Sequence, residues 1–316
     1  MGKKLCLAGL LSLSIFFFNL AVYFVYPDIS RLKKENPGKT AFMRLAEKKW
    51  REEGRRRKIH WYWAPLSGIS PYLVEAVLIA EDDDFWSHEG FNMEEIEKAM
   101  KKNIKAKKFQ RGASTITQQL ARNLYLSPSK NPVRKLKEAI LALRLERTLS
   151  KRRILEIYLN VAEWGEGVFG IEAASWHYYG KPSLALGPQE AARLASVLPN
   201  PKKYNPIKPG KYVKDRSRFI CGIMANRGLI NETEKKMAAL QKPETPAKLN
   251  KKNNALPRRR PAARYKSSRP MLAKNVPHRK MPPRAARKKN IPVHIASLPG
   301  PDLWEKSKIC NIEPAE

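Results

Sequence analysis

Apolar residues recur at helical spacing along the middle of this chain, from Ser70 to about Gly228. Leu73, Val77 and Ala80, for example, follow one another at intervals of three or four residues. Such a period is typical of amphipathic helices, and the strict alternation that indicates a half-buried strand is nearly absent. The sequence therefore predicts an all-α domain.

Several helices can be placed individually. Ser70-Pro71 is a helix-start signal, because proline is favoured in the first helical turn. Ser114 or Thr115 can cap a helix that runs to Leu124. Ser150 can cap the later helix at residues 150–159. Further periodic segments occupy residues 93–100, 133–149, 150–159 and 189–198.

The N-terminus carries an uncharged, mostly apolar segment at residues 5–26. About 20 apolar residues are enough to cross a bilayer. A cleaved signal peptide has a shorter apolar core and a small-residue cleavage site, but Pro-Asp follows here at 27–28. We therefore favour a retained transmembrane helix over a cleaved signal. Lysines at 3–4 place the N-terminus inside, whereas the basic residues at 31–34 oppose that, so charge leaves the orientation open.

The composition divides the rest of the chain. Residues 27–59 are polar and charged and are predicted to be a stalk or linker, and residues 60–235 form the predicted folded domain. Residues 242–316 hold 19 Lys and Arg against five Asp and Glu, lack apolar periodicity and are predicted to be disordered.

The formal net charge of +33 implies anionic partners. Nucleic acid, anionic lipid head groups and pyrophosphate substrates all fit this charge, which alone does not choose among them. The three cysteines, Cys6, Cys221 and Cys310, are far apart and match no metal-binding spacing.

An acidic string, EDDDFWSHEG at residues 81–90, follows a buried apolar helical turn. A carboxylate at the end of such a helix can have its proton affinity tuned by burial and by neighbouring charges, as acid–base chemistry requires. The alternative is an acidic helix end that simply faces solvent.

Two further strings carry polar side chains at helical spacing. In RGASTITQQLARN, at residues 111–123, Gln118 and Arg122 share one helix face. Sugars need amide and hydroxyl partners, and phosphates need arginine and backbone N–H groups. Without other context this is also the pattern of a capped surface helix. In RKLKE, at residues 134–138, the first and last residues form an ordinary helix-stabilising pair.

Together with KRRILEIYLN at residues 151–160, these strings closely resemble the peptidoglycan glycosyltransferases of glycosyltransferase family 51. The run EWGEGVFG at 163–170 and the run LPNP at 198–201 look most like the stand-alone, monofunctional branch of that family. The resemblance covers roughly residues 60–230, and its four motifs occur in the family's order.

The resemblance implies a lysozyme-like fold with a small membrane-associated lobe, after an N-terminal transmembrane helix. It implies polymerisation of lipid II, with inversion and release of polyprenyl pyrophosphate. Glu81 matches the family's general base, and Glu138 matches a second glutamate that positions or activates substrates. The residues matching substrate contacts are Ser114, Gln118, Gln119, Arg122, Arg134, Lys135 and Arg216.

The resemblance also implies a place and partners. The protein would be a single-pass protein of the bacterial inner membrane, with its catalytic domain on the periplasmic side. Its substrates would be lipid II and the growing glycan chain, and cell-division or elongation proteins would be partners. Cationic side chains or Mg²⁺ would meet the leaving pyrophosphate. Independently of the resemblance, the charge of the basic tail predicts that it binds polyanions.

The chain departs from the family pattern at Asp83 and Asp84, which either perturb the proton affinity of Glu81 or face solvent. Arg122 stands where many relatives have lysine, so the charge is kept. The S-x-x-K match at residues 127–130 has no partner motifs, so no transpeptidase activity is expected.

Two other functions compete with the polymerase. One is a lysozyme-like hydrolase or lytic enzyme of the cell wall, and the other is a non-enzymatic binder of anionic polymers through the basic tail. The glutamine-rich helix and the RKLKE motif favour polymerisation.

Overall fold

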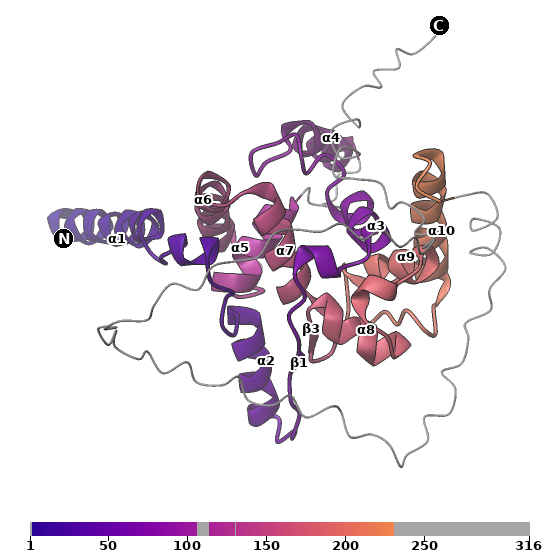
Figure 1. The fold of residues 1–316 in the computed structure, drawn as a ribbon. Coiled ribbons are helices and arrows are strands. Elements are labelled where there is room, and N and C mark those ends of the chain that lie inside the picture. The colour runs from indigo at the N-terminus through magenta and orange to yellow at the C-terminus, as the bar shows by residue number, and fades with distance from the viewer. Residues whose placement is uncertain (1, 106–113, 130, 231–316) are drawn as a thin grey trace, which may run out of the picture. The chain divides into compact units, whose positions relative to one another are not determined.

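The computed structural model describes residues 2–105, 114–129 and 131–230. Helices dominate this part of the chain, which confirms the all-α prediction (Figure 1). In chain order they are α1 (Gly2–Ala21), α2 (Ala41–Glu52), α3 (Pro71–Glu81), α4 (Met93–Lys105), α5 (Ile116–Tyr125), α6 (Pro132–Thr148), α7 (Lys151–Val161), α8 (Ile171–Tyr179), α9 (Pro188–Val197) and α10 (Lys211–Asn226). Short 3-10 turns lie at Val22–Phe24, Ser30–Lys33, Leu66–Gly68 and Ser183–Ala185.

The helix starts follow the local sequence. α3 begins with Pro71, as the Ser-Pro signal predicts. The Thr115 hydroxyl caps α5 by accepting a hydrogen bond from the Gln118 N–H, and Ser150 caps α7 in the same way. The helices expected near 93–100, 133–149 and 189–198 are all present, with bounds shifted by a few residues.

A small three-stranded sheet interrupts the helices. Its strands are β1 (His60–Trp61), β2 (Glu163–Gly165) and β3 (Val168–Phe169), in the order β1-β3-β2. β1 runs parallel to β3, and β2 runs antiparallel to it. Strands of two or three residues are too short to show an alternating pattern, so the sequence did not predict them.

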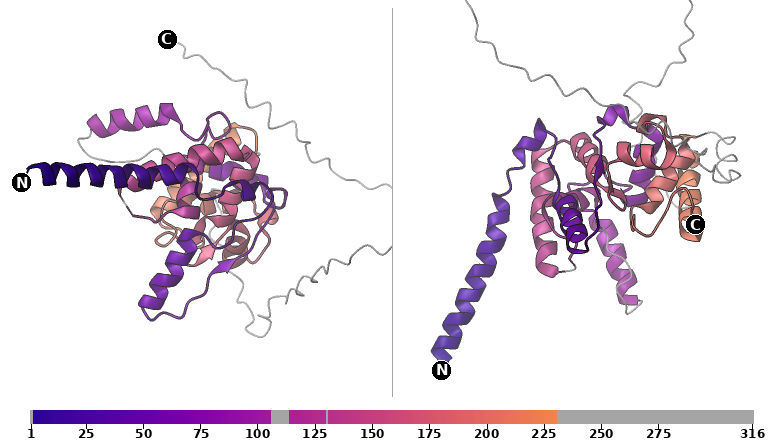
Figure 2. Two further views of the ribbon diagram at one scale, coloured as in Figure 1. Left: turned by 90° about the vertical axis from the view of Figure 1, so that its left-hand side faces the viewer. Right: turned by 90° about the horizontal axis from the view of Figure 1, so that it is seen from below.

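The main core lies between two groups of helices. α5 packs against α6 and α7, and α9 packs against α3 and α10 (Figures 1 and 2). Fully buried side chains such as Leu73, Leu120 and Ile154 join these groups in one apolar cluster. Each large aliphatic side chain buried in this way stabilises the fold by about 1.5–3 kcal/mol.

α2 packs on the domain through a second cluster. Met43, Ala46 and Trp50 are buried there with Phe169 of β3. The segment 27–59 thus contains a docked helix, and the apolar face of α2 accounts for the docking.

The segment that follows α1 is bound to α6. The Arg144 guanidinium donates hydrogen bonds to the backbone carbonyls of Tyr23, Val25 and Pro27 at 2.7–2.9 Å. The Lys137 ammonium lies 4.7 Å from the centre of the Tyr23 ring.

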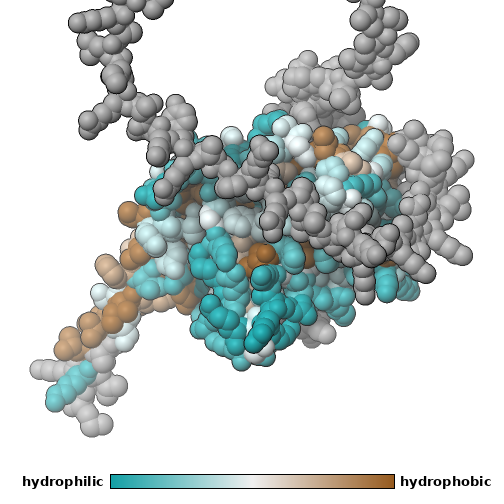
Figure 3. Space-filling view, turned by 60° about the horizontal axis from the view of Figure 1, so that its bottom comes forward, coloured by the Kyte–Doolittle hydropathy of each residue, from teal (hydrophilic) through white to brown (hydrophobic). Residues whose placement is uncertain are grey.

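Exposed apolar side chains gather along α1, among them Leu10, Phe17 and Phe18 (Figure 3). None of the helices described here is long and apolar enough to cross a membrane. The predicted transmembrane helix at residues 5–26 is therefore not confirmed. The predicted basic tail at 242–316 lies outside the described residues, as do Lys130 and residues 111–113.

Candidate active site

Glu81 ends α3, whose other residues are largely buried. A carboxylate oxygen of Glu81 accepts a hydrogen bond from the Gln119 amide nitrogen of α5 at 2.8 Å. The Gln119 amide oxygen in turn accepts a hydrogen bond from the Tyr158 hydroxyl of α7 at 3.0 Å. Three helices that are distant in sequence therefore meet at the Glu81 carboxylate.

The next residue, Asp82, is buried and fastens the loop after α3. One of its oxygens accepts a hydrogen bond from the Ile116 N–H at 2.9 Å, and the other lies 2.8 Å from the His88 Nε2. The His88 Nδ1 accepts a hydrogen bond from the Gly90 N–H at 3.1 Å. Since Nδ1 is an acceptor, the ring proton is on Nε2 and is donated to Asp82.

Other contacts hold the same loop against its neighbours. The Thr115 hydroxyl donates to the Gly90 carbonyl at 2.7 Å. Phe85 is fully buried, and the Lys151 ammonium lies 4.5 Å from the centre of its ring. The histidine and glycine of the acidic string thus shape the loop that follows Glu81.

Asp83 and Asp84 have partners of their own. Both Asp83 carboxylate oxygens accept from the Arg227 guanidinium, at 2.7 and 2.8 Å. Arg227 also pairs with Glu75 at 2.7 Å, and Asp84 accepts from the Asn92 side-chain amide at 2.7 Å. Both aspartates are exposed. The structure therefore favours the prediction that they face solvent over the prediction that they perturb the proton affinity of Glu81.

Glu138 is fully buried on α6 and is neutralised by two cations one turn earlier. Its carboxylate oxygens accept from the Arg134 guanidinium and the Lys135 ammonium. The Lys135 ammonium also donates to the Gln118 amide oxygen at 3.0 Å and to the Ser114 hydroxyl at 3.1 Å. A buried carboxylate is stable only when it is paired in this way.

The first turns of α5 connect the two glutamates. Gln118 contacts the Lys135–Glu138 group, and its neighbour Gln119 contacts Glu81. Most of the residues predicted to form the site therefore share one surface around the start of α5.

The two remaining predicted cations lie close to Glu81. Arg216 of α10 donates to the Ala80 carbonyl at 2.5 Å. The Arg122 guanidinium of α5 has no hydrogen-bonding partner in the part of the chain that the structure describes, and its charge acts on Tyr158. Burial raises the pKa of Tyr158 well above its ordinary value, and the charge of Glu81 raises that pKa further.

Sequence reasoning missed three supporting residues, although they lie in or beside its motifs. Asp82 and Tyr158 hold the surroundings of Glu81, as described. The fully buried Asn160 amide forms two hydrogen bonds of 2.8 Å with the Ala64 backbone, which fixes the chain leading to α3. Tyr158 and Asn160 could have been singled out because both lie in the motif KRRILEIYLN. The sequence alone, however, does not show that this motif packs beside Glu81.

The side chains suit an anionic ligand better than a metal ion held by protein. No group of three or more His, Cys, Asp or Glu residues in the described ranges could hold a metal ion. The oxygens of Asp82 and Glu138 are already taken by donors.

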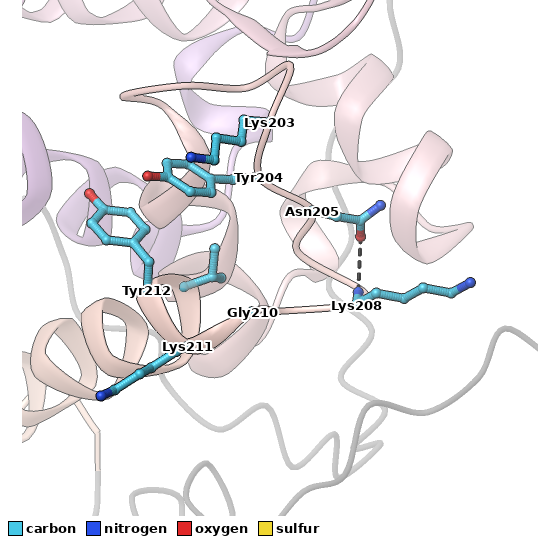
Figure 4. Close-up of a pocket in the computed structure, with 8 residues that line it drawn as sticks. Lys203, Tyr204, Asn205, Lys208, Gly210, Lys211 and Tyr212 are labelled. Atoms are coloured by element: carbon cyan, nitrogen blue, oxygen red, sulfur yellow. Dashed lines mark hydrogen bonds between the residues drawn. The ribbon is translucent and has the colours of Figure 1, made fainter.

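A separate shallow hollow of about 440 Å³ lies at the start of α10 (Figure 4). Tyr204 and Tyr212 stack there with ring centres 4.5 Å apart. Lys203, Lys208 and Lys211 also line it, but the residues around Glu81 do not.

Comparison with known proteins shows the family of this chain. A family model described as Transglycosylase matches residues 48–225, more than half of the chain. A relative from Nitrosospira multiformis is 44% identical over 220 residues, covering 68% of this chain and 96% of the relative. A relative from Azoarcus sp. strain BH72 is 48% identical over 180 residues, covering 57% of this chain and 78% of the relative. A relative from Methylobacillus flagellatus is 42% identical over 220 residues, covering 70% of this chain and 96% of the relative. All three relatives are named biosynthetic peptidoglycan transglycosylase. The chain therefore belongs to the transglycosylase family.

Proposed function

We propose that this protein is a peptidoglycan glycosyltransferase that polymerises the glycan chain from lipid II in cell wall synthesis. The family match and the shared name of the relatives support this function. The observation that carries it is the Glu81 carboxylate, held by Gln119 beside the cations of α5 and α6.

Glu81 is the proposed general base. It takes the proton from the 4-hydroxyl of the acceptor lipid II, and the oxygen attacks the anomeric carbon of the donor chain. The new glycosidic C–O bond forms as the bond to pyrophosphate breaks, with inversion at that carbon. A hydroxyl is a poor nucleophile, and a positioned base accelerates such a step by about 10²–10⁴-fold.

Cations on α5 and α6 would stabilise the leaving group. Negative charge develops on the pyrophosphate as its bond to the sugar breaks, and fixed positive charge is effective there because it needs no reorganisation. Arg122, Arg134 and Lys135 are the proposed contacts, with Ser114 and Gln118 beside them. Buried Glu138 would act by positioning Arg134 and Lys135 rather than by touching the reacting atoms.

A role for Mg²⁺ is a separate proposal. Magnesium ions commonly bind substrate phosphates while keeping several waters. Because the described residues offer no cluster of metal ligands, such an ion would arrive with the pyrophosphate of the substrate. Chelation with EDTA tests this: the polymerisation rate should fall, and added Mg²⁺ should restore it.

The substrate carries a polyprenyl chain, so we propose that the protein acts at the inner membrane with its catalytic domain outside the cytoplasm. The exposed apolar side chains of α1 support membrane attachment. We propose single-pass insertion, which a protease-protection experiment on spheroplasts tests. Cleavage of residues 27–230 by external protease is expected, and protection would contradict it.

The decisive experiment incubates the full chain with labelled lipid II in detergent. Long glycan products are expected. Shortening of preformed glycan would instead support the hydrolase alternative, and no product under several detergents and Mg²⁺ concentrations would contradict the polymerase. Glu81→Gln should abolish polymerisation with the fold intact, and Asp84→Asn is the matched control because the Asp84 carboxylate is exposed and accepts from Asn92, outside the site.

The basic tail at 242–316 is proposed to be dispensable for this reaction and to bind polyanions loosely, with strong salt dependence. Removing residues 242–316 should leave the polymerisation rate unchanged. A loss of polymerisation would show that the tail takes part in catalysis.

Proposed partners among cell-division or elongation proteins can be sought by cross-linking in cells.

A further inference from the structure

We propose that Tyr158 is a positioning residue for the general base: its hydroxyl fixes the orientation of the Gln119 amide, and this amide keeps the Glu81 carboxylate ionised and aimed. The inference rests on the function proposed above and adds a residue to it. Tyr158 does not contact the substrate in this account.

The first step of the argument is the direction of the two hydrogen bonds. A tyrosine hydroxyl that donates to the Gln119 Oε1 leaves the Nε2 of that amide to face Glu81. An amide rotated by half a turn would place its oxygen against the carboxylate, and two acceptors would then repel each other. The Glu81 carboxylate, which can only accept, thus selects this orientation, and the Ser114 carbonyl supports it by accepting from the same Nε2 at 3.5 Å. The Tyr158 hydroxyl holds the amide in this orientation by donating to its Oε1.

The second step is that Tyr158 stays a donor. The side chain is 1% exposed, and its burial raises its pKa well above the ordinary value. Glu81 and Asp82 raise this pKa further, whereas Arg122 opposes them. The hydroxyl is consequently protonated at neutral pH and available as a donor.

The third step concerns Glu81 itself. A hydrogen bond donated to a carboxylate favours its charged form. Among the described residues, the charged or titratable groups near this chain of bonds include Asp82 and His88 in the loop, Arg122, whose charge acts on Tyr158, and Arg216, which donates to the Ala80 carbonyl. Replacing Tyr158 changes none of these charges. A changed protonation of Glu81 in such a variant would therefore indicate a changed hydrogen bond from the Gln119 amide.

The test is the pH dependence of kcat/KM for polymerisation of labelled lipid II by the full chain. Tyr158→Phe keeps the ring and removes only the hydroxyl. We expect its acid limb to move up by about 0.5–1 pH unit and kcat to fall about fivefold, with KM unchanged. Tyr179→Phe is the control, because this partly buried tyrosine of α8 has a buried hydroxyl with no partner in the described structure.

A second substitution keeps the test sharp if the phenylalanine variant does not fold. A fluorinated tyrosine at position 158 is a stronger donor of nearly the same size, so the acid limb should move to lower pH. Gln119→Met should shift the limb upward, and adding Tyr158→Phe to it should cause little further shift, because both changes break one chain of bonds.

The outcomes separate the two proposals. An inactive wild-type enzyme contradicts the proposed function. If the wild type is active and a folded Tyr158→Phe variant has the same acid limb, the role of Tyr158 is overturned. The same conclusion follows if fluorotyrosine at position 158 does not move the acid limb. Fully additive shifts in the double variant overturn it as well.

Discussion

The carboxylate of Asp82 accepts a hydrogen bond from the backbone N–H of Ile116 across 2.9 Å, which ties the end of α3 to the first turn of α5. The two residues are 34 positions apart in sequence. Their neighbours in the chain include Glu81 on one side and Gln119 on the other, and these two are also hydrogen-bonded. The bond therefore sets the register between the proposed base and the helix that orients it.

Asp82→Asn should weaken this register. The substitution removes the charge that strengthens the bond to Ile116 and presents an amide that satisfies only one of the two donors. We expect the free energy of unfolding to fall by about 1–3 kcal/mol and polymerisation to slow. Urea unfolding and initial rates measure both effects. Asp84→Asn, on the exposed side of the same loop, should change stability by less than about 0.5 kcal/mol, and equal effects of the two would contradict the prediction.

Glu138→Gln should be costly because Glu138 is fully buried between two cations. Losing its charge leaves Arg134 and Lys135 without a counterion, and breaking a buried pair typically costs about 3–5 kcal/mol. Glutamine still offers an amide oxygen as acceptor, and water can reach the partly exposed Lys135. We therefore expect a loss of unfolding free energy at the lower end of that range. Denaturant unfolding measures the effect, with the exposed Glu97→Gln as control. Wild-type stability in Glu138→Gln would refute the structural role.

Gly170→Ala should destabilise the start of α8 strongly. Gly170 has a φ of 78°, and an added Cβ would lie 2.6 Å from the Asn160 carbonyl oxygen. Gly180 is the comparison, because its φ is also positive but a Cβ there meets nothing within 4 Å. Gly180 has a ψ of 24° in the left-handed helical region, whereas Gly170 has a ψ of 145°, which only glycine adopts readily. We expect about 1–2 kcal/mol at Gly180 from backbone strain, and about 1–3 kcal/mol more at Gly170 from the clash together with its greater backbone strain. Equal losses in thermal or urea unfolding would show that the close approach to Asn160 adds nothing to the cost.

Cys221 should resist alkylation in the folded protein. Burial raises the pKa of its thiol to about 11, so little thiolate is present at pH 8. In a variant with serine at Cys6 and Cys310, iodoacetamide should label Cys221 only after denaturant is added. Rapid labelling of the native variant at pH 8 would contradict the burial of this side chain.

Glu163 should make stability depend on pH. Burial raises the pKa of this carboxyl, while Lys202 only partly opposes the shift. Because the folded-state pKa exceeds the unfolded one, the stabilising contribution is complete below the ordinary value of 4.5 and is lost as pH rises through the raised one. Unfolding free energies at pH 4 to 7 should fall more in the wild type than in Glu163→Gln. Parallel curves for the two proteins would disprove this.

The sequence alone determined the helical class and the starts of several helices. These features follow from local rules: a period of 3.6 residues, a capping hydroxyl and a proline in the first turn depend only on neighbouring residues. Motif resemblance then indicated the chemistry of Glu81, Glu138 and the cations.

Only the tertiary structure decided how those residues are held. Tyr158 reaches Gln119 across 39 positions of sequence, and Trp61 donates to the Asn160 carbonyl across 99. Strand β1 pairs with the distant β3, with His60 opposite Val168, and Asp83 finds its partner in Arg227 at the end of α10. Such contacts depend on how the helices pack, and no local pattern encodes which side chains that packing brings together.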